Sequence, residues 1–309
     1  MKKEIKGLLI GGVVAIVLSV LVVLLMYLKG YVEERNVVWV FCGVIFIDLI
    51  YLCWRYFHLV KETTEKTSWK SHSIGFGLAI LLALVLRSFT FEPYNIPSGS
   101  MFPTLLVGDH LFISKYAYGY SRHSFPFSLP LIPKGRIFEK NPKVGDVVVF
   151  RVTPELMPSL NRSVDYIKRV IALPGDTVQM KNGRLYLNSK EVDRKYLSTV
   201  KAEIEGREVL YTKYLETLPN GVTHEIYEIN DMMKSDDTPE IKVPEGYFFA
   251  MGDNRDNSYD SRFFGVVPLT HLEGRAEVIF YSNNGMGEFW QFWKWPTFIR
   301  TERLFTKIK

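Results

Sequence analysis

Three long apolar runs lie within the first ninety residues, and they constrain the chain more than any other feature. They cover residues 8–28, 37–57 and 74–91. An apolar helix of about 20 residues is long enough to cross a bilayer. The sequence therefore predicts a membrane anchor over residues 1–91 with about three transmembrane helices. Two spans remain an alternative if the second run, which carries Asp48, does not cross, and a cleaved signal sequence is an alternative for the first run.

The distribution of lysines predicts how these helices are oriented. Lysines precede the first run and fill the loop between the second and third runs, at Lys2, Lys3, Lys6, Lys61, Lys66 and Lys70. Basic loops stay preferentially on the cytoplasmic side of a membrane. With three spans, we therefore expect everything after about residue 91 to lie outside the cytoplasm.

Charge and cysteine content argue against a nucleic-acid-binding protein and against a disulfide between the two cysteines. The 309 residues carry a formal net charge of +5, and no nucleic-acid-binding motif is present, so we expect no nucleic-acid partner. A modest basic balance suits anionic lipid headgroups. Cys42 and Cys53 are the two cysteines, and on a helix they lie about 16 Å apart along the axis, too far for a disulfide.

Beyond the anchor, the pattern changes to short β-type runs separated by turn residues. Residues 109–114, 144–150, 166–172, 247–252 and 275–281 are predicted strands, and Lys181-Asn182-Gly183 predicts a hairpin turn. We therefore expect a mostly β domain over residues 92–309, with an inserted subdomain at about 177–246. The aromatic cluster at 289–295 has two interpretations left open, a packed core or a patch resting on the membrane surface.

The segment Pro97-Ser98-Gly99-Ser100 combines a flexible glycine with two hydroxyls directly after the anchor. Gly99 permits a sharp turn, so one serine oxygen could be exposed as a nucleophile. A turn without chemistry is the alternative. Four histidines follow this segment, and none lies in a recognised triad signature. We likewise find no zinc-binding pattern and expect no metal.

Lys168 is a second candidate for chemistry. It lies in an otherwise apolar run whose one other charge is Arg169, and in a strand it shares a face with Tyr166. A buried lysine loses its proton more readily and can then act as a base. The alternative is a lysine whose ammonium reaches solvent at a sheet edge.

The third candidate is the polar stretch from Met251 to Arg262, which contains three aspartates, two asparagines and two arginines. Alternating oxygen ligands are one interpretation, but Arg255 and Arg262 would repel a cation. A scaffold of hydrogen-bonded Asp–Arg pairs is the better physical interpretation.

These three motifs, in this order, resemble those of bacterial type I signal peptidases. The likeness covers residues 92–265, with a weaker likeness between the motifs. It implies N-terminal transmembrane helices followed by a mostly β extracytoplasmic catalytic domain of signal-peptidase type. It departs from the best-known members in its three apparent spans and in lacking a periplasmic disulfide.

The resemblance also implies roles for individual residues. Ser100 would be the nucleophile and Lys168 the general base. Ser98 and the main-chain N–H of Ser100 would form the oxyanion hole. Supporting roles would fall to Gly252, Ser258, Asp260 and Arg262, and the substrate pockets would be lined by Tyr94, Ile96, Leu105, Tyr166 and Ile167.

The implied function is a membrane-bound serine endopeptidase that removes N-terminal signal peptides from exported preproteins after a small-x-small motif, without a cofactor. We expect a multi-pass protein of the bacterial cytoplasmic membrane, with its catalytic domain on the periplasmic side. Preproteins and membrane phospholipids are the expected partners, and contact with the export translocon is left open. The alternatives are a Ser-His hydrolase using His110 and a non-enzymatic, membrane-anchored β-rich binding or assembly factor.

Overall fold

The computed structural model describes residues 89–121, 124, 135–204, 207–233, 235–284 and 298–309, together with Tyr51 and Gly77. The chain divides into two compact units, residues 1–90 and 91–309. The predicted span at 8–28 lies outside the described residues, as do most of the spans at 37–57 and 74–91 and the aromatic cluster at 289–295. None of the helices in the described part combines the length and the apolar character needed to cross a bilayer.

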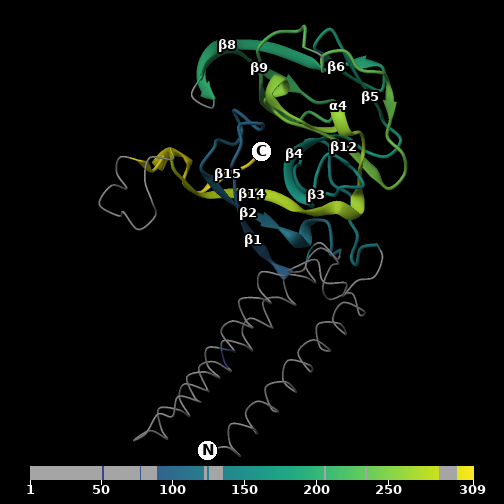
Figure 1. Ribbon diagram of the computed structural model, residues 1–309, viewed down its shortest axis with the longest axis vertical. Coiled ribbons are helices and arrows are strands. Elements are labelled where there is room, and N and C mark those ends of the chain that lie inside the picture. Colours follow the sequence, from purple (N-terminus) through teal and green to yellow (C-terminus); the bar gives the residue numbers. More distant parts are fainter. Residues whose placement is uncertain are drawn as a thin grey trace, which may run out of the picture. The chain divides into compact units, whose positions relative to one another are not determined.

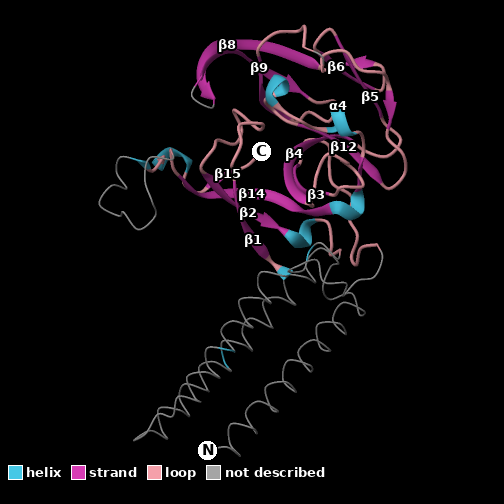
Figure 2. Cartoon of the chain, viewed as in Figure 1, coloured by secondary structure: helices cyan, strands magenta, loops and turns pink. Residues whose placement is uncertain are grey.

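The unit from residue 91 to residue 309 is built mainly of β-strands joined by short helical turns (Figures 1 and 2). The strands are β1 (Phe91–Asn95), β2 (Asp109–Ser114), β3 (Val147–Val152), β4 (Val164–Ala172), β5 (Thr177–Lys181), β6 (Arg184–Leu187), β7 (Lys190–Glu191), β8 (Asp193–Ile204), β9 (Arg207–Thr217), β10 (Thr223–Glu228), β11 (Ile241–Lys242), β12 (Tyr247–Met251), β13 (Val267–Pro268), β14 (Leu272–Ser282) and β15 (Thr306–Lys307). The short helical elements are η1 (Lys115–Ala117), η4 (Arg255–Asn257), α4 (Ser261–Phe264), η5 (Leu269–His271) and η7 (Thr301–Arg303).

Eight strands form the largest sheet, in the order β1-β2-β14-β3-β4-β12-β13, with β15 paired to β14. All of its pairings are antiparallel. The predicted strands at 109–114, 144–150, 166–172, 247–252 and 275–281 correspond to β2, β3, β4, β12 and β14, and are confirmed with shifts at their ends. The predicted hairpin at Lys181-Asn182-Gly183 is confirmed as the β5–β6 turn.

The core lies on both sides of this sheet, and β3 shows why. Because side chains alternate along a strand, Val149 faces one apolar cluster with Leu105 and Leu111, whereas Val148 and Phe150 face another. All three β3 residues are buried. The continuous apolar sequence of β3 therefore reflects burial on two faces.

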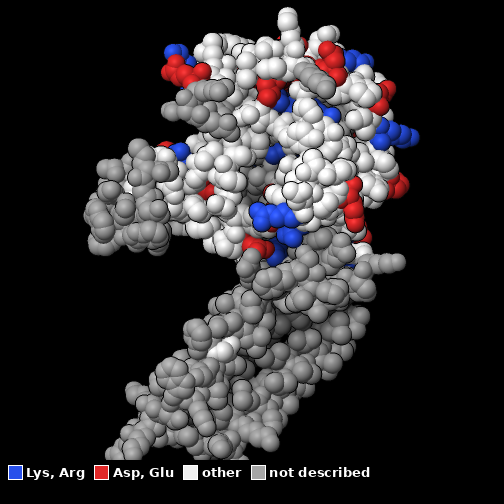
Figure 3. Space-filling view, viewed as in Figure 1, with Lys and Arg blue, Asp and Glu red and all other residues white. Residues whose placement is uncertain are grey.

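Residues 177–242 form the two smaller sheets, β11-β5-β6-β7 and β10-β9-β8. The long strands β8 and β9 pair as a ribbon that curves over the upper part of Figure 1. Leu210 and Tyr196 on this ribbon are each 57% exposed. On the face of the 91–309 unit drawn in Figure 3, charged side chains gather along the upper and right-hand margins and in a Lys/Arg patch at the lower middle, and the area between them is mostly uncharged.

Candidate active site

Ser100 and Lys168 lie in contact although 68 positions separate them in the chain. After β1, the backbone turns sharply, with Phe102 N donating to Gly99 O at 3.1 Å and Leu105 N donating to Met101 O at 2.9 Å. This turn carries Ser100 to the side of β4 that holds Lys168. Lys168 Nζ lies 2.7 Å from Ser100 Oγ, within hydrogen-bond distance for proton transfer in either direction.

The environment of Lys168 favours the neutral amine. Its residue is 4% exposed, and burial lowers its pKa to about 8. The charges of Asp260 and Asp253 oppose this shift, and the charge of Arg262 adds to it. Lys168 Nζ also donates to the carbonyl oxygen of Ile167 at 2.9 Å, which fixes the direction of the side chain. A neutral amine held against a hydroxyl is the arrangement that activates a serine.

Ser98 lies on the exposed side of the same turn. Its Oγ is 3.4 Å from Ser100 Oγ, and the residue is exposed whereas Ser100 is half-buried. A hydroxyl in this position can donate to an oxygen that develops negative charge beside Ser100.

The loop from Gly252 to Arg262 holds the serine turn from behind. Asn254 Nδ2 donates to Gly99 O at 2.9 Å, and the main-chain N of Asn254 donates to Ser100 O at 3.1 Å. A Cβ added to Gly252 would overlap both Ser100 O and Ser258 Oγ. Only a glycine therefore allows this loop to approach the serine so closely.

An internal ion pair gives this loop its shape. Arg262 donates to the Asp260 carboxylate through Nε and Nη2, both at 2.9 Å, and to Arg255 O at 2.5 Å. Asp260 also accepts from Gly252 N at 2.9 Å. Although burial opposes ionisation, the charge of Arg262 holds the pKa of Asp260 below its ordinary value. The pair thus stays ionised and ties the two ends of the loop together.

Ser258 is buried within the same loop, and its side chain lies beside Gly252 and Ser100. Among the described residues, Lys168 Nζ donates to Ser100 Oγ and Ile167 O, and no hydrogen bond joins it to Ser258. The buried Ser258 Oγ has no hydrogen-bond partner among the described residues. In this structure Ser258 therefore lies beside Gly252 and makes no direct bond to the amine.

The five residues expected to line substrate pockets divide between the two faces of the sheet. Ile96 and Leu105 are buried in one apolar cluster, against which Tyr94 and Ile167 pack. Tyr166 packs against the other cluster, and Lys168 Nζ lies 5.4 Å from the centre of its ring. The alternation of side chains along β4 accounts for this division.

Tyr94 is anchored at its hydroxyl end. Its Oη donates to Glu273 and lies 3.4 Å from Asp165. Glu273 also pairs with Arg151 at 2.8 Å, while burial and the charge of Asp165 raise the pKa of Glu273 to about 7. The hydroxyl end of Tyr94 is therefore held by a polar network, and no local pattern in the sequence predicts this network.

A second ion pair beside the site, between Arg169 and Asp253, was not predicted from the sequence. Arg169 donates to the Asp253 carboxylate through Nε at 2.8 Å and Nη2 at 2.6 Å, and Thr104 Oγ1 donates to Asp253 at 2.5 Å. Arg169 points to the face of β4 opposite Lys168. The signal available in the sequence was a single arginine in an apolar strand, because an arginine buried there needs a carboxylate partner.

His110, the histidine of the Ser-His alternative, lies on β2 opposite Asn95. Its ring contacts the rings of Phe280 and Tyr281, and among the described residues no hydrogen bond joins it to Ser100. The base that Ser100 meets is Lys168. Within the described part of the chain, no group of three or more His, Cys, Asp or Glu side chains is arranged to hold a metal ion.

Comparisons with known proteins identify the family to which the chain belongs. The family model described as signal peptidase, peptidase S26, matches residues 69–281. The signal peptidase I of Rickettsia conorii is 42% identical over 233 residues, which are 72% of this chain and 83% of the relative. That of Rickettsia canadensis is 42% identical over 234 residues, with the same shares. A crystal structure of a signal peptidase I from Enterococcus faecalis is 27% identical, covers 44% of this chain and 97% of its own, and has a TM-score of 0.25. Since the family model matches well over half of the chain, and the rickettsial relatives are similar over most of their length, the chain belongs to the S26 family of signal peptidases.

Proposed function

We propose that Ser100 and Lys168 are the nucleophile and the general base with which this chain, as a serine endopeptidase, removes N-terminal signal peptides from preproteins. Membership of the S26 signal peptidase family supports the activity. One observation supports the residues above all others: Lys168 Nζ lies 2.7 Å from Ser100 Oγ, and Lys168 is 4% exposed.

The reaction begins with attack by Ser100 Oγ on the carbonyl carbon that follows the small-x-small motif. A C–O bond forms, the carbonyl oxygen takes the electron pair, and neutral Lys168 accepts the hydroxyl proton. The C–N bond then breaks, and the Lys168 ammonium gives its proton to the leaving amine. In deacylation, Lys168 takes a proton from water as the water attacks the ester, and returns that proton to Ser100 Oγ when the acid product leaves.

The remaining residues would support these steps. The Ser98 hydroxyl and the main-chain N–H of Ser100 would donate to the oxyanion. Gly252, Ser258, Asp260 and Arg262 would keep the loop against the serine turn. The pockets for small side chains would be lined by Tyr94, Ile96, Leu105, Tyr166 and Ile167, a set supported by the packing of four of them around one cluster.

The domain organisation and location extend the proposal to the whole chain. Residues 1–91 would form a multi-pass anchor in the bacterial cytoplasmic membrane, and residues 92–309 a periplasmic catalytic domain with an insertion at about 177–246. The apolar runs and the placement of lysines support this topology. Phospholipids would then be direct partners, and the export translocon would be a neighbour in the same membrane.

The test is cleavage of a preprotein by the purified, detergent-solubilised chain, followed by mass measurement of both products. We expect a single cut directly after a small-x-small motif, and no cut with Ser100→Ala. Circular dichroism of the variant controls for its fold. Full activity of Ser100→Ala, or cutting elsewhere, would overturn the proposal.

A further inference from the structure

Residues 298–309, here called the C-terminal segment, run along the turn that follows the serine. Arg303 donates to Thr104 O at 3.0 Å and to the buried Asp109 carboxylate at 2.5 and 2.9 Å. Arg300 donates to Val107 O at 2.9 Å. Strand β15 then pairs with β14, so that the chain ends beside the large sheet (Figure 1). The segment therefore holds both ends of the loop from Thr104 to Asp109.

The same segment reaches the residue next to Lys168. Arg169 Nη1 donates to the main-chain oxygen of Lys309 at 2.9 Å and to Gly145 O at 2.8 Å. Its other N–H groups bind Asp253 and Thr104. A guanidinium has five N–H donors, and these five contacts use all of them. Because Arg169 is fully buried, each acceptor matters: a buried charged donor without a partner is costly.

Arg169 connects the C-terminal segment to Ser100 through two adjacent residues, Asp253 and Asn254. Asp253, its ion-pair partner, directly precedes Asn254, whose side chain and main chain bind Gly99 O and Ser100 O. A turn of the Arg169 guanidinium toward a replacement acceptor would move Asp253, and with it the support behind Ser100. Displacements of about 1 Å at a reacting group can cost up to about a hundredfold in rate.

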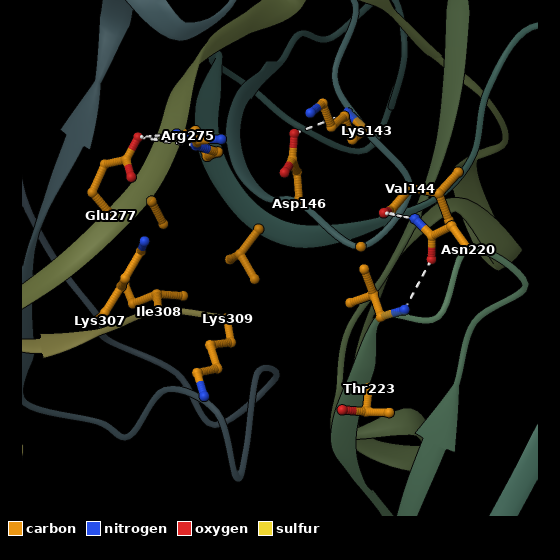
Figure 4. Close-up of a pocket in the computed structure, with 14 residues that line it drawn as sticks. Lys143, Val144, Asp146, Asn220, Thr223, Arg275, Glu277, Lys307, Ile308 and Lys309 are labelled. Atoms are coloured by element: carbon orange, nitrogen blue, oxygen red, sulfur yellow. Dashed lines mark hydrogen bonds and ion pairs between the residues drawn. The ribbon is translucent and has the colours of Figure 1, made fainter.

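Residues 307–309 of the C-terminal segment line a cleft. The cleft has a volume of about 410 Å³, with Lys307, Ile308 and Lys309 on one side and Asn220 and Thr223 on the other (Figure 4). The Lys309 side chain is exposed, whereas its main-chain oxygen is directed to Arg169. The ammonium and the oxygen of this residue can therefore be tested separately.

We propose that the C-terminal segment is a positioning element of the active site, which holds Arg169 through the main-chain oxygen of Lys309 and the serine turn through Arg303. The proposal rests on Ser100 and Lys168 as the reacting residues. The segment touches neither of them, so its effect is on their geometry.

The test compares three variants of the full-length protein in a peptide-cleavage assay. Ending the chain at Lys307 removes the oxygen that Arg169 binds, and we expect kcat to fall about tenfold with KM within about twofold. Lys309→Ala keeps the main-chain oxygen and should leave kcat unchanged. Ile308→Ala, which removes only apolar packing, controls for the loss of that side chain and should also stay within about twofold.

A fourth variant keeps the inference testable if the shortened chain does not fold. Arg303→Lys retains a positive charge beside Asp109, but one ammonium cannot match the fork that reaches both Asp109 and Thr104 O. We expect kcat to fall about threefold to tenfold with KM within about twofold, measured at a temperature at which circular dichroism shows the variant to be folded.

Three results would overturn the inference. They are an unchanged kcat in both the shortened chain and Arg303→Lys, an equal loss in Lys309→Ala, and a change confined to KM. Ser100→Ala, measured alongside, separates the two proposals. An active Ser100→Ala would overturn the proposed function, whereas an inactive Ser100→Ala beside fully active segment variants would overturn this inference alone.

Discussion

Lys168 is placed where its charged form is costly and its neutral form is useful. The residue is 4% exposed, so few water molecules can solvate an ammonium there. Asp260 and Asp253 would stabilise that ammonium, but each is already paired with an arginine. The net effect is a pKa lowered to about 8, close enough to neutral pH for proton transfer in both directions.

Lowering this pKa has a cost in stability, which gives a first prediction. Below pH 8 Lys168 is charged in both the folded and unfolded states, so folding buries a charge. We expect Lys168→Met to raise the free energy of unfolding at pH 7 by about 1–3 kcal/mol relative to the unmodified protein. The variant should lose all activity. The advantage should shrink as pH rises from 8 toward 10.5, where the unfolded lysine also becomes neutral. Urea titrations at several pH values measure it, and a less stable variant at pH 7 would contradict the burial argument.

Ser98 supports a second prediction at the same scale. If its hydroxyl donates to the oxyanion, Ser98→Ala should lower kcat by about a hundredfold, with little change in KM. Ser98→Thr keeps a hydroxyl and serves as the matched control, which should retain most of the activity. Steady-state kinetics decide, and an unchanged kcat for Ser98→Ala would remove this residue from the oxyanion hole.

At the scale of elements, a buried ion pair joins the loop from Gly252 to Arg262 to the three-stranded sheet β10-β9-β8. Arg255 in η4 donates to both oxygens of Glu216 on β9, at 2.8 and 2.5 Å. Both side chains are at most 2% exposed. Although burial opposes its ionisation, the charge of Arg255 and the contact with His224 hold the pKa of Glu216 well below its ordinary value. The pair is therefore ionised and shielded from solvent.

A third prediction contrasts this pair with an exposed one on the same ribbon. Lys201 and Glu208 form an ion pair at 3.1 Å whose side chains are 67% and 70% exposed. Glu216→Gln leaves the Arg255 charge buried and should lower the free energy of unfolding by about 3 kcal/mol or more. Lys201→Ala should change it by less than about 0.5 kcal/mol. Chemical denaturation measures the free energy of unfolding of both variants. Equal losses in Glu216→Gln and Lys201→Ala would show that the Arg255–Glu216 pair is not buried as described.

Local signals predicted the elements that carry the site but not the contacts between them. The apolar run around Lys168 predicted β4, and Lys181-Asn182-Gly183 predicted the β5–β6 turn, because both patterns arise from neighbouring residues. The Arg169–Asp253 pair joins residues 84 positions apart. The Arg169–Lys309 contact joins residues 140 positions apart. Neither pair has a local pattern, so only the fold reveals them.

The strands β8 and β9 of the insertion were not predicted, and their exposure explains why. The charged, mixed sequence from residue 193 to residue 240 gave no strand signal, yet β8 and β9 run through much of it. A ribbon such as this buries few side chains, as the exposure of Leu210 and Tyr196 shows. Without a buried face, alternation of apolar and polar residues is not required and no strand pattern results.

At the largest scale, all of the proposed site residues lie in one of the two compact units of the chain. Residues 91–309 form a compact unit with its own apolar clusters. We expect a chain beginning at Phe89 to fold and to cleave a short soluble peptide with a kcat close to that of the full chain. Cleavage of a membrane-inserted preprotein should be slower by about a hundredfold, because the anchor raises the effective concentration of the two partners in one membrane.

Two assays check this fourth prediction. One measures peptide cleavage by the shortened chain, and the other measures preprotein cleavage in vesicles, each against the full-length protein. Equal rates on the membrane-inserted preprotein would show that residues 1–88 do not contribute to substrate capture. Loss of peptide cleavage in a folded shortened chain would show that these residues contribute to the active site itself.

In the proposed reaction Lys168 becomes neutral near pH 8 and then accepts the proton of Ser100. The most direct measurement follows the Lys168 amine by NMR in protein labelled with carbon-13 at the lysine Cε, assigned with Lys168→Met, and compares it with kcat/KM across pH. We expect both to titrate with a midpoint near pH 8, with kcat/KM rising as Lys168 loses its proton. A Lys168 amine that titrates near its ordinary pKa of 10.5, or a pH–rate profile that does not follow the titration of this amine, would rule out Lys168 as the general base.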